Sequence, residues 1–181
     1  MITKIMTALA SQLTAIGAID VREAFIHATF APAKKGAQSR ENEAWQGTKI
    51  MAVADRNGLP VSVCTESATP HEVTLAVSTL LKMVVEDAPQ NLIGDNAYDS
   101  DRLDAELPFY GVEVIAPHRR TRRNPTQDGR RLKRYPRRWK IERLIGWLQN
   151  FRRLVVRYER HAENFLGMLQ LASSLILLRR L

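Results

Sequence analysis

An Asn-Gly pair between two apolar runs constrains the fold of this chain more than any other feature of its sequence. This pair, Asn57-Gly58, ends the connection Asp55-Arg56-Asn57-Gly58 between residues 48–54 and residues 60–66, and both runs contain several β-branched residues. This arrangement is a strong short-range signal for a β-hairpin, because Asn and Gly adopt the positive φ angles that a two-residue turn needs. A third run of the same kind, 23–30, precedes the hairpin and stops before Pro32. The sequence therefore predicts three consecutive strands with antiparallel pairing.

Helical and strand patterns alternate after the hairpin. Thr69-Pro70-His71-Glu72 resembles a capping box, with Thr69 as the cap, and predicts a helix that runs to about Asp87. Further strands are expected at 91–95 and 112–116, and further helices at 100–107, 136–153 and 162–180. Helices between strands favour parallel pairing, so we expect an α/β protein with a mixed sheet and helices on both faces. This order of elements is that of the ribonuclease-H-like fold.

The length of the chain, 181 residues, fits one main domain, and its 45% apolar content is enough for a core. Residues 1–18 are expected to form a short helical remnant ahead of that domain at 19–181. The longest apolar stretch, 165–178, is shorter than the ~20 residues that a membrane span needs. No signal peptide opens the chain, and a single cysteine, Cys64, fits a reducing compartment. We therefore expect a cytoplasmic protein without a membrane partner.

Positive charge is concentrated in one segment. The formal net charge is +8, and residues 118–160 hold 16 Lys and Arg against 3 Asp and Glu. The rest of the chain then carries 11 basic and 16 acidic residues, so the segment is basic and the body mildly acidic. Such asymmetry favours a polyanionic partner, and a merely solvated basic surface is the alternative.

Asp95 is the first candidate for a functional acid. It ends the apolar run 92–94, and ligands of open α/β sheets gather beyond the ends of strands. An aspartate that caps a turn is the alternative. Two acids that follow closely, Asp99 and Asp101, are expected to cap the next helix.

Glu142 is the second candidate. It is a lone acid within a basic helical segment, which favours a metal ligand among phosphate-binding cations. The alternative is an ion pair with Arg138, since residues four apart are neighbours on a helix, and such a pair contributes only ~0.3–0.5 kcal/mol.

Two motifs carry a resemblance to a known family. The segment Gly94-Asp95-Asn96-Ala97-Tyr98-Asp99-Ser100 resembles the surroundings of the second Asp in insertion-sequence transposases. Tyr135-x2-Arg138-x3-Glu142 is similar to the first three letters of the signature Tyr-x2-Arg-x3-Glu-x6-Lys, which marks one large group of these enzymes. The likeness extends over nearly all of residues 20–181. On these residues the chain resembles the catalytic domain of a bacterial DDE transposase.

The resemblance implies an enzyme of DNA transposition that works by Mg²⁺-dependent (or Mn²⁺-dependent) strand cleavage and transfer. Such enzymes hold two metal ions with two Asp and one Glu, and here Asp95 and Glu142 would be two of these ligands. The implied partner is double-stranded DNA, both the ends of the element and the target. The residues expected to contact DNA are Tyr135, Arg138, Arg119, Arg120, Arg122, Arg123 and Lys133.

Three departures from the family pattern change these expectations. His27 stands in Phe25-Ile26-His27-Ala28-Thr29-Phe30 where the family has its first catalytic Asp, and a neutral imidazole is a poor ligand for Mg²⁺. Gln149 replaces the Lys of the signature. The helical DNA-binding region that such transposases carry is not recognisable in residues 1–18, so a second copy of the chain or an upstream helical polypeptide is an expected partner.

His27 leaves open whether this copy is active. One alternative to the enzyme is a truncated or inactivated copy, a non-catalytic remnant that binds DNA without cutting it. A structure-directed nuclease on the same fold is a third, weaker alternative.

Overall fold

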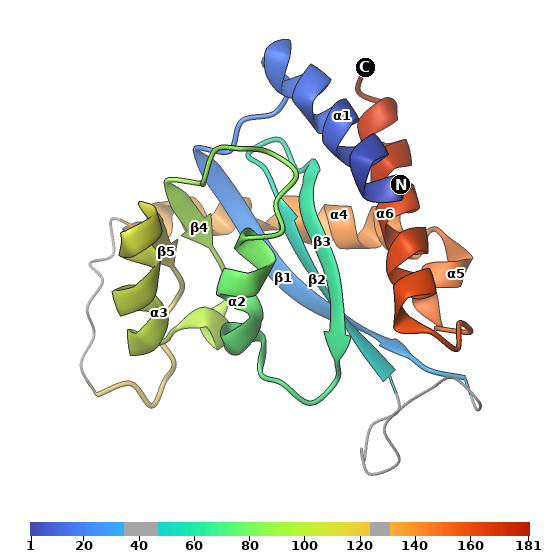
Figure 1. The fold of residues 1–181 in the computed structure, drawn as a ribbon. Coiled ribbons are helices and arrows are strands. Elements are labelled where there is room, and N and C mark those ends of the chain that lie inside the picture. The colour runs from blue at the N-terminus through green and yellow to red at the C-terminus, as the bar shows by residue number, and fades with distance from the viewer. Residues whose placement is uncertain (35–46, 124–130) are drawn as a thin grey trace.

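A computed structural model describes residues 1–34, 47–123 and 131–181. The centre of the fold is a five-stranded sheet in the order β3-β2-β1-β4-β5 (Figure 1). The strands are β1 (Glu23–Pro32), β2 (Gly47–Ala54), β3 (Pro60–Ser67), β4 (Asn91–Ile93) and β5 (Glu113–Ile115).

The pairing of the strands confirms the predicted mixed sheet. β2 pairs antiparallel with β1 and with β3, whereas β4 pairs parallel with β1 and with β5. The predicted hairpin joins β2 to β3, and Gly58 has a φ of 83° at its turn. A side chain is strained at that angle, which is why the turn requires glycine.

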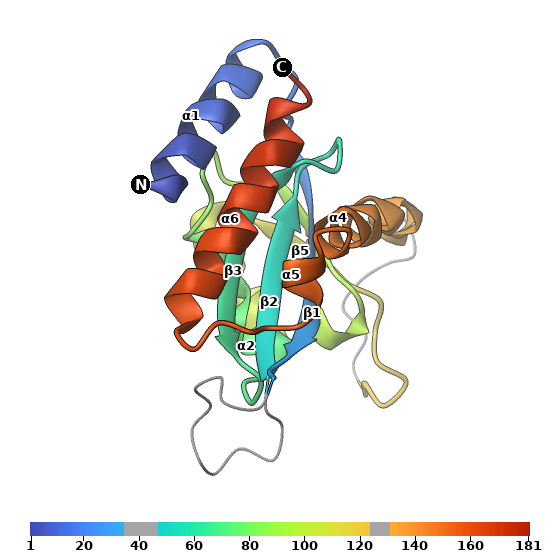
Figure 2. The same cartoon turned by 90° about the vertical axis from the view of Figure 1, so that its right-hand side faces the viewer.

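Helices cover both faces of this sheet. They are α1 (Ile2–Ala15), α2 (Glu72–Leu80), α3 (Asp101–Glu106), α4 (Trp139–Gln149), α5 (Arg152–Val155) and α6 (Ala162–Leu178), with short 3₁₀ turns η1 (Asn96–Tyr98), η2 (Leu107–Tyr110) and η3 (Arg131–Arg138). α2 lies in front of the sheet and α4 crosses behind β1 and β2 (Figure 1). α1 packs along α6 beside β3 (Figure 2), and buries Met6, Ala10 and Leu13. None of the helices in the described ranges has the length and apolar character to cross a bilayer.

The predicted capping box before α2 is wrong. His71, not Thr69, precedes the first helical residue, and no side chain caps the helix. The helix also ends at Leu80 rather than near Asp87. The backbone turns there because the N–H of Val84 donates to the carbonyl of Val61 on β3, and this sheet contact replaces further helical bonds.

The predicted helix 136–153 is interrupted. Residues up to Arg138 form the 3₁₀ turn η3, which contains Pro136, and only then does α4 begin. Phe151 is extended, with φ −81° and ψ 98°, and separates α4 from α5. The break turns the chain so that Leu154 is buried in the core, which a straight helix would not achieve.

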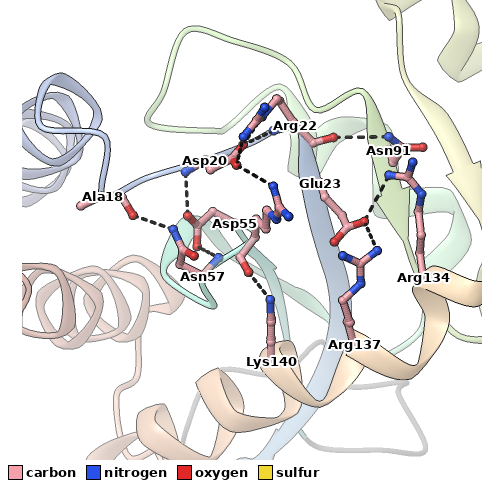
Figure 3. Close-up of polar contacts among 11 residues, drawn as sticks. Ala18, Asp20, Arg22, Glu23, Asp55, Asn57, Asn91, Arg134, Arg137 and Lys140 are labelled. Carbon is pink, nitrogen blue, oxygen red and sulfur yellow. Dashed lines mark hydrogen bonds and ion pairs between the residues drawn. The ribbon is translucent and has the colours of Figure 1, made fainter.

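The hairpin turn is tied to the segment between α1 and β1 by a buried carboxylate, Asp55 (Figure 3). Its Oδ1 accepts from the N–H groups of Asn57 (2.9 Å) and Leu59 (2.7 Å), and its Oδ2 accepts from the N–H of Asp20 (2.9 Å). Burial raises the pKa of Asp55, and the three donors oppose this shift. The side chain of Asn57 adds a bond to the carbonyl of Ala18, 2.9 Å away.

Replacing Asp55 with Ala should lower the free energy of unfolding by about 3 kcal/mol, since three backbone N–H groups lose a buried acceptor. Asp55→Asn keeps one oxygen for two of these donors and should cost less. The measurement is urea unfolding followed by circular dichroism, with exposed Asp87→Ala as the control. Equal unfolding midpoints for Asp55→Ala and Asp87→Ala would contradict this role.

Candidate active site

The parallel register of β1 and β4 brings His27 and Asp95 together. Phe25 pairs with Ile93, so the residues two further along each chain reach the same level of the sheet. The His27 Nδ1 lies 3.7 Å from the Asp95 Oδ2. This distance is too long for a hydrogen bond, so the contact is electrostatic. The residue at the place of the family's first acid and the second acid are therefore neighbours.

Asp95 is also a capping residue, the alternative considered from the sequence. Its Oδ1 accepts from the N–H of Ala97 at 2.8 Å and starts η1. The other oxygen, Oδ2, is left to face His27 and Arg138. The His27 ring has the largest effect on the pKa of Asp95 and lowers it; burial opposes this, and the donors around the carboxylate add to the lowering.

Arg138 joins the two candidate acids. One of its nitrogens, Nη2, lies 3.8 Å from Asp95 Oδ2 and 3.2 Å from Glu142 Oε1. Because both distances start from the same nitrogen, these two oxygens are at most 7.0 Å apart. Its other terminal nitrogen donates to the Tyr135 hydroxyl at 3.1 Å. The Arg138–Glu142 ion pair, which was considered above as the simpler alternative, is therefore present. Arg138 pairs with Asp95 as well.

A second ion-pair cluster anchors the turn that carries Tyr135 and Arg138. Glu23, at the start of β1, has a side chain that is only 4% exposed, and its Oε1 lies 3.2 Å from Arg134 and 2.9 Å from Arg137 (Figure 3). Glu23 is thus held at the start of β1, four residues before His27, which lies in the middle of the strand. The cluster positions η3 against the sheet, and thereby positions Arg138.

Two further arginines expected to contact DNA bind protein oxygens, as Arg138 does. Arg119 donates from Nε to the carbonyl of Asn96 (2.9 Å) and from Nη2 to that of Ala97 (2.8 Å). Arg122 pairs with Asp99, Asp101 and Asp104. Both guanidinium groups therefore fasten the loop after β5 to the segment that follows Asp95, which the sequence alone did not indicate.

The expectation that Asp99 caps α3 is wrong. Ser100 holds the cap position, and no side chain bonds there. Asp99 is buried and accepts from the N–H of Arg119 at 2.8 Å, with His118 Nδ1 at 3.0 Å. Burial raises the pKa of Asp99. The hydrogen bonds from Arg119 and His118 and the charge of Arg122 lower it by more, so the pKa lies below its usual value. Asp99 is a structural anchor of the loop.

The remaining predicted DNA contacts lie on the surface. Arg120, Arg123 and Lys133 are exposed, as is Gln149 at the end of α4. Arg119 is exposed as well, but its guanidinium group is already bonded to two backbone carbonyls.

The described residues contain no group of three His, Cys, Asp or Glu side chains placed to hold a metal ion. Asp95 and Glu142 offer two carboxylates, and the His27 ring lies beside Asp95. One acid near the site was missed from the sequence. Glu72 was interpreted only as part of a capping box, but α2, which begins with Glu72, packs against η1, the turn that Asp95 caps. Burial raises the pKa of Glu72, and the charge of Asp95 raises it further.

Comparisons with known proteins show the family and the fold of this chain. Residues 13–177 match the family described as Transposase DDE domain. A Burkholderia cepacia protein, assigned as a transposase for insertion sequence element IS402, is 32% identical over 138 residues. The match covers 72% of this chain and 62% of that relative, so the chain spans about three fifths of the relative's length.

Two solved structures share the fold. The piggyBac transposase in a synaptic complex with hairpin DNA has a TM-score of 0.55 at 14% identity, over 89% of this chain and 48% of its own. A chain of the simian T-cell lymphotropic virus intasome, in complex with PP2A regulatory subunit B56 gamma, has a TM-score of 0.52 at 16% identity, over 86% and 48%. At such identities the likeness concerns the fold alone, which is ribonuclease-H-like. By the match over residues 13–177, this chain belongs to the transposase DDE domain family.

Proposed function

We propose that this chain is the catalytic domain of an insertion-sequence DNA transposase, with Asp95 and Glu142 as ligands of divalent metal ions, Mg²⁺ or Mn²⁺. The observation that carries the proposal is the meeting of these two acids at one nitrogen of Arg138, Asp95 from the turn after β4 and Glu142 from α4. Family membership supplies the reaction class.

Two side chains of the site, Asp95 and Glu142, are of the kind that binds a hard cation such as Mg²⁺. Both acids offer carboxylate oxygens, which Mg²⁺ prefers, and Mg²⁺ keeps several waters, so few protein ligands suffice. A guanidinium nitrogen between the two carboxylates marks a place where positive charge is stabilised. When bound, the metal ions stabilise the attacking and leaving oxygens of an in-line phosphoryl displacement.

The other residues either orient the two acids or contact DNA. Arg138 holds Glu142 toward Asp95 and is itself oriented by Tyr135. Exposed Arg120, Arg123 and Lys133 supply the contacts with DNA phosphates, in double-stranded element ends and target. A second chain, either a copy of this one or a helical polypeptide, supplies recognition of the element's ends.

A second candidate is a remnant that binds DNA without cutting it. His27 favours this candidate, because the imidazole at 3.7 Å from Asp95 replaces an anionic oxygen ligand.

The test is a strand-cleavage assay in Mn²⁺ on duplexes that carry the inverted repeats flanking this reading frame. We expect slow cleavage by the native protein, and none by Asp95→Asn or Glu142→Gln. Glu163→Gln, in the first turn of α6, is the matched control and should cut like the native chain. If native, His27→Asp and Asp95→Asn proteins bind the duplex equally and none cuts it, the remnant is the correct assignment.

A further inference from the structure

Glu72 is a half-buried acid with no hydrogen bond or ion pair among the described residues. It is the first residue of α2, which packs against η1, the turn that starts at Asp95. Burial raises its pKa, the charge of Asp95 raises it further, and His27, Lys49 and Arg138 lower it. The groups that act on Glu72 are therefore those of the candidate active site.

A second observation points to the same place. Tyr98 is fully buried, and its hydroxyl has no hydrogen-bond partner among the residues described. Buried hydroxyls without a partner are uncommon and call for an explanation such as water or an ion. After burial, the charges of Glu72 and then Asp95 are the main causes that raise the pKa of Tyr98. The hydroxyl thus lies close to both acids.

The Tyr98 ring packs against the backbone at Gly94, just after β4. A Cβ atom on Gly94 would lie 2.5 Å from Tyr98 Cδ2, closer than such contacts occur, so only glycine leaves room. The ring is thereby packed against the backbone at Gly94, the residue before Asp95, in the turn that α2 contacts.

We propose that Glu72 is a further acid of the metal site, and that its carboxylate binds the water ligands of the ion held by Asp95 and Glu142. This inference rests on the proposed metal-dependent function. Contact through water agrees with the lack of three directly converging ligands in the described part of the chain. It also suits Mg²⁺, which gives up its waters reluctantly. The Tyr98 hydroxyl would accept from the same waters, and Glu72 would supply part of the negative charge that His27 does not.

The other explanation of Glu72 is a helix-terminal acid. A carboxylate in the first turn interacts favourably with the helix dipole, whether or not metal binds. Glu163 also lies in the first turn of a helix, α6, is exposed, and provides a control for the helix dipole.

The experiment measures Mn²⁺ binding by the loss of the electron paramagnetic resonance signal of free Mn²⁺, in the full chain carrying His27→Asp. Glu72→Gln should weaken binding about 10-fold, the lower range for outer-shell partners of metal sites. Asp95→Asn should weaken it more, and Glu163→Gln should leave it unchanged. Without metal, Glu72→Gln should raise the melting temperature by about 2 °C, because it removes repulsion with Asp95.

Each outcome decides a different point. If Glu72→Gln binds Mn²⁺ like Glu163→Gln while Asp95→Asn binds weakly, the inference is overturned and the proposed function stands. If Asp95→Asn also binds like its parent, or if the parent binds no Mn²⁺, both are overturned. A melting temperature that falls in Glu72→Gln, with unchanged Mn²⁺ affinity, would identify a helix-terminal acid and overturn the inference.

Discussion

Replacing His27 with Asp is expected to raise Mg²⁺ affinity by at least ~10-fold and to bring strand cleavage clearly above background, since even outer-shell changes alter metal affinity by ~10–100-fold. In the native chain the side chain 3.7 Å from Asp95 is an imidazole. An imidazole supplies no oxygen ligand, and raising the pH does not make it an anion. Asp at this position adds both an oxygen ligand and a negative charge. Calorimetric titration with Mg²⁺, followed by cleavage assays in Mg²⁺ and Mn²⁺, measures the two effects.

The same variant should depend on metal for its stability. Without Mg²⁺, the carboxylate introduced by His27→Asp would face Asp95 at short range, and the repulsion should lower the melting temperature below that of the native chain. Saturating Mg²⁺ should reverse the loss, because a ligand that binds only the folded state stabilises it. His27→Asn, which adds no charge, is the control and should show neither effect. A native chain that already binds two Mg²⁺ and cuts as well as His27→Asp would refute the alignment of β1 with the family.

Binding to duplex DNA should weaken steeply with salt. Each phosphate that a protein neutralises adds ~0.9 to the slope of log affinity against log salt, so contact with five or more phosphates gives a slope steeper than about −4. Neutralising the exposed pair Arg120 and Arg123 to Gln should reduce that slope by about 2. Fluorescence anisotropy of a labelled duplex at several salt concentrations measures both quantities.

Arg122→Gln is the informative comparison for this experiment. Arg122 pairs with Asp99, Asp101 and Asp104, so its loss should lower stability and leave the salt slope nearly unchanged. Binding without salt dependence, or binding unaffected by the Arg120 and Arg123 changes, would show that this surface does not contact DNA.

The sheet could be predicted because its signals are local. The Asn57-Gly58 turn, the β-branched runs around it and the later alternation with helices each lie within short stretches of chain, and the described fold confirms them. The boundaries were less predictable, since they depend on partners elsewhere. α2 ends early because Val84 bonds to Val61, and the long helix breaks at Phe151 where the chain turns Leu154 into the core.

The candidate site, like the fold, could be predicted from the sequence only in part. Motif order was enough to select Asp95, Glu142 and the position of His27, and parallel pairing of β1 and β4 implies that two of them meet. Their catalytic roles remain predictions. The partners of Arg119, Arg122 and Asp99 were not predictable, because a basic or acidic side chain has the same local pattern whether it faces solvent, DNA or a neighbour about 20 residues away.

The sequence by itself therefore determined the succession of strands and helices along the chain, the mixed type of the sheet and which acids to examine. Each of these depends on residue type and short spacing. Only the tertiary structure decided which cations are already bound within the protein, and that α2, which begins with Glu72, packs against the turn formed by Asp95 and Tyr98. The physical reason is that charges and hydroxyls interact through space, over a few ångströms, between segments that the sequence separates by tens of residues.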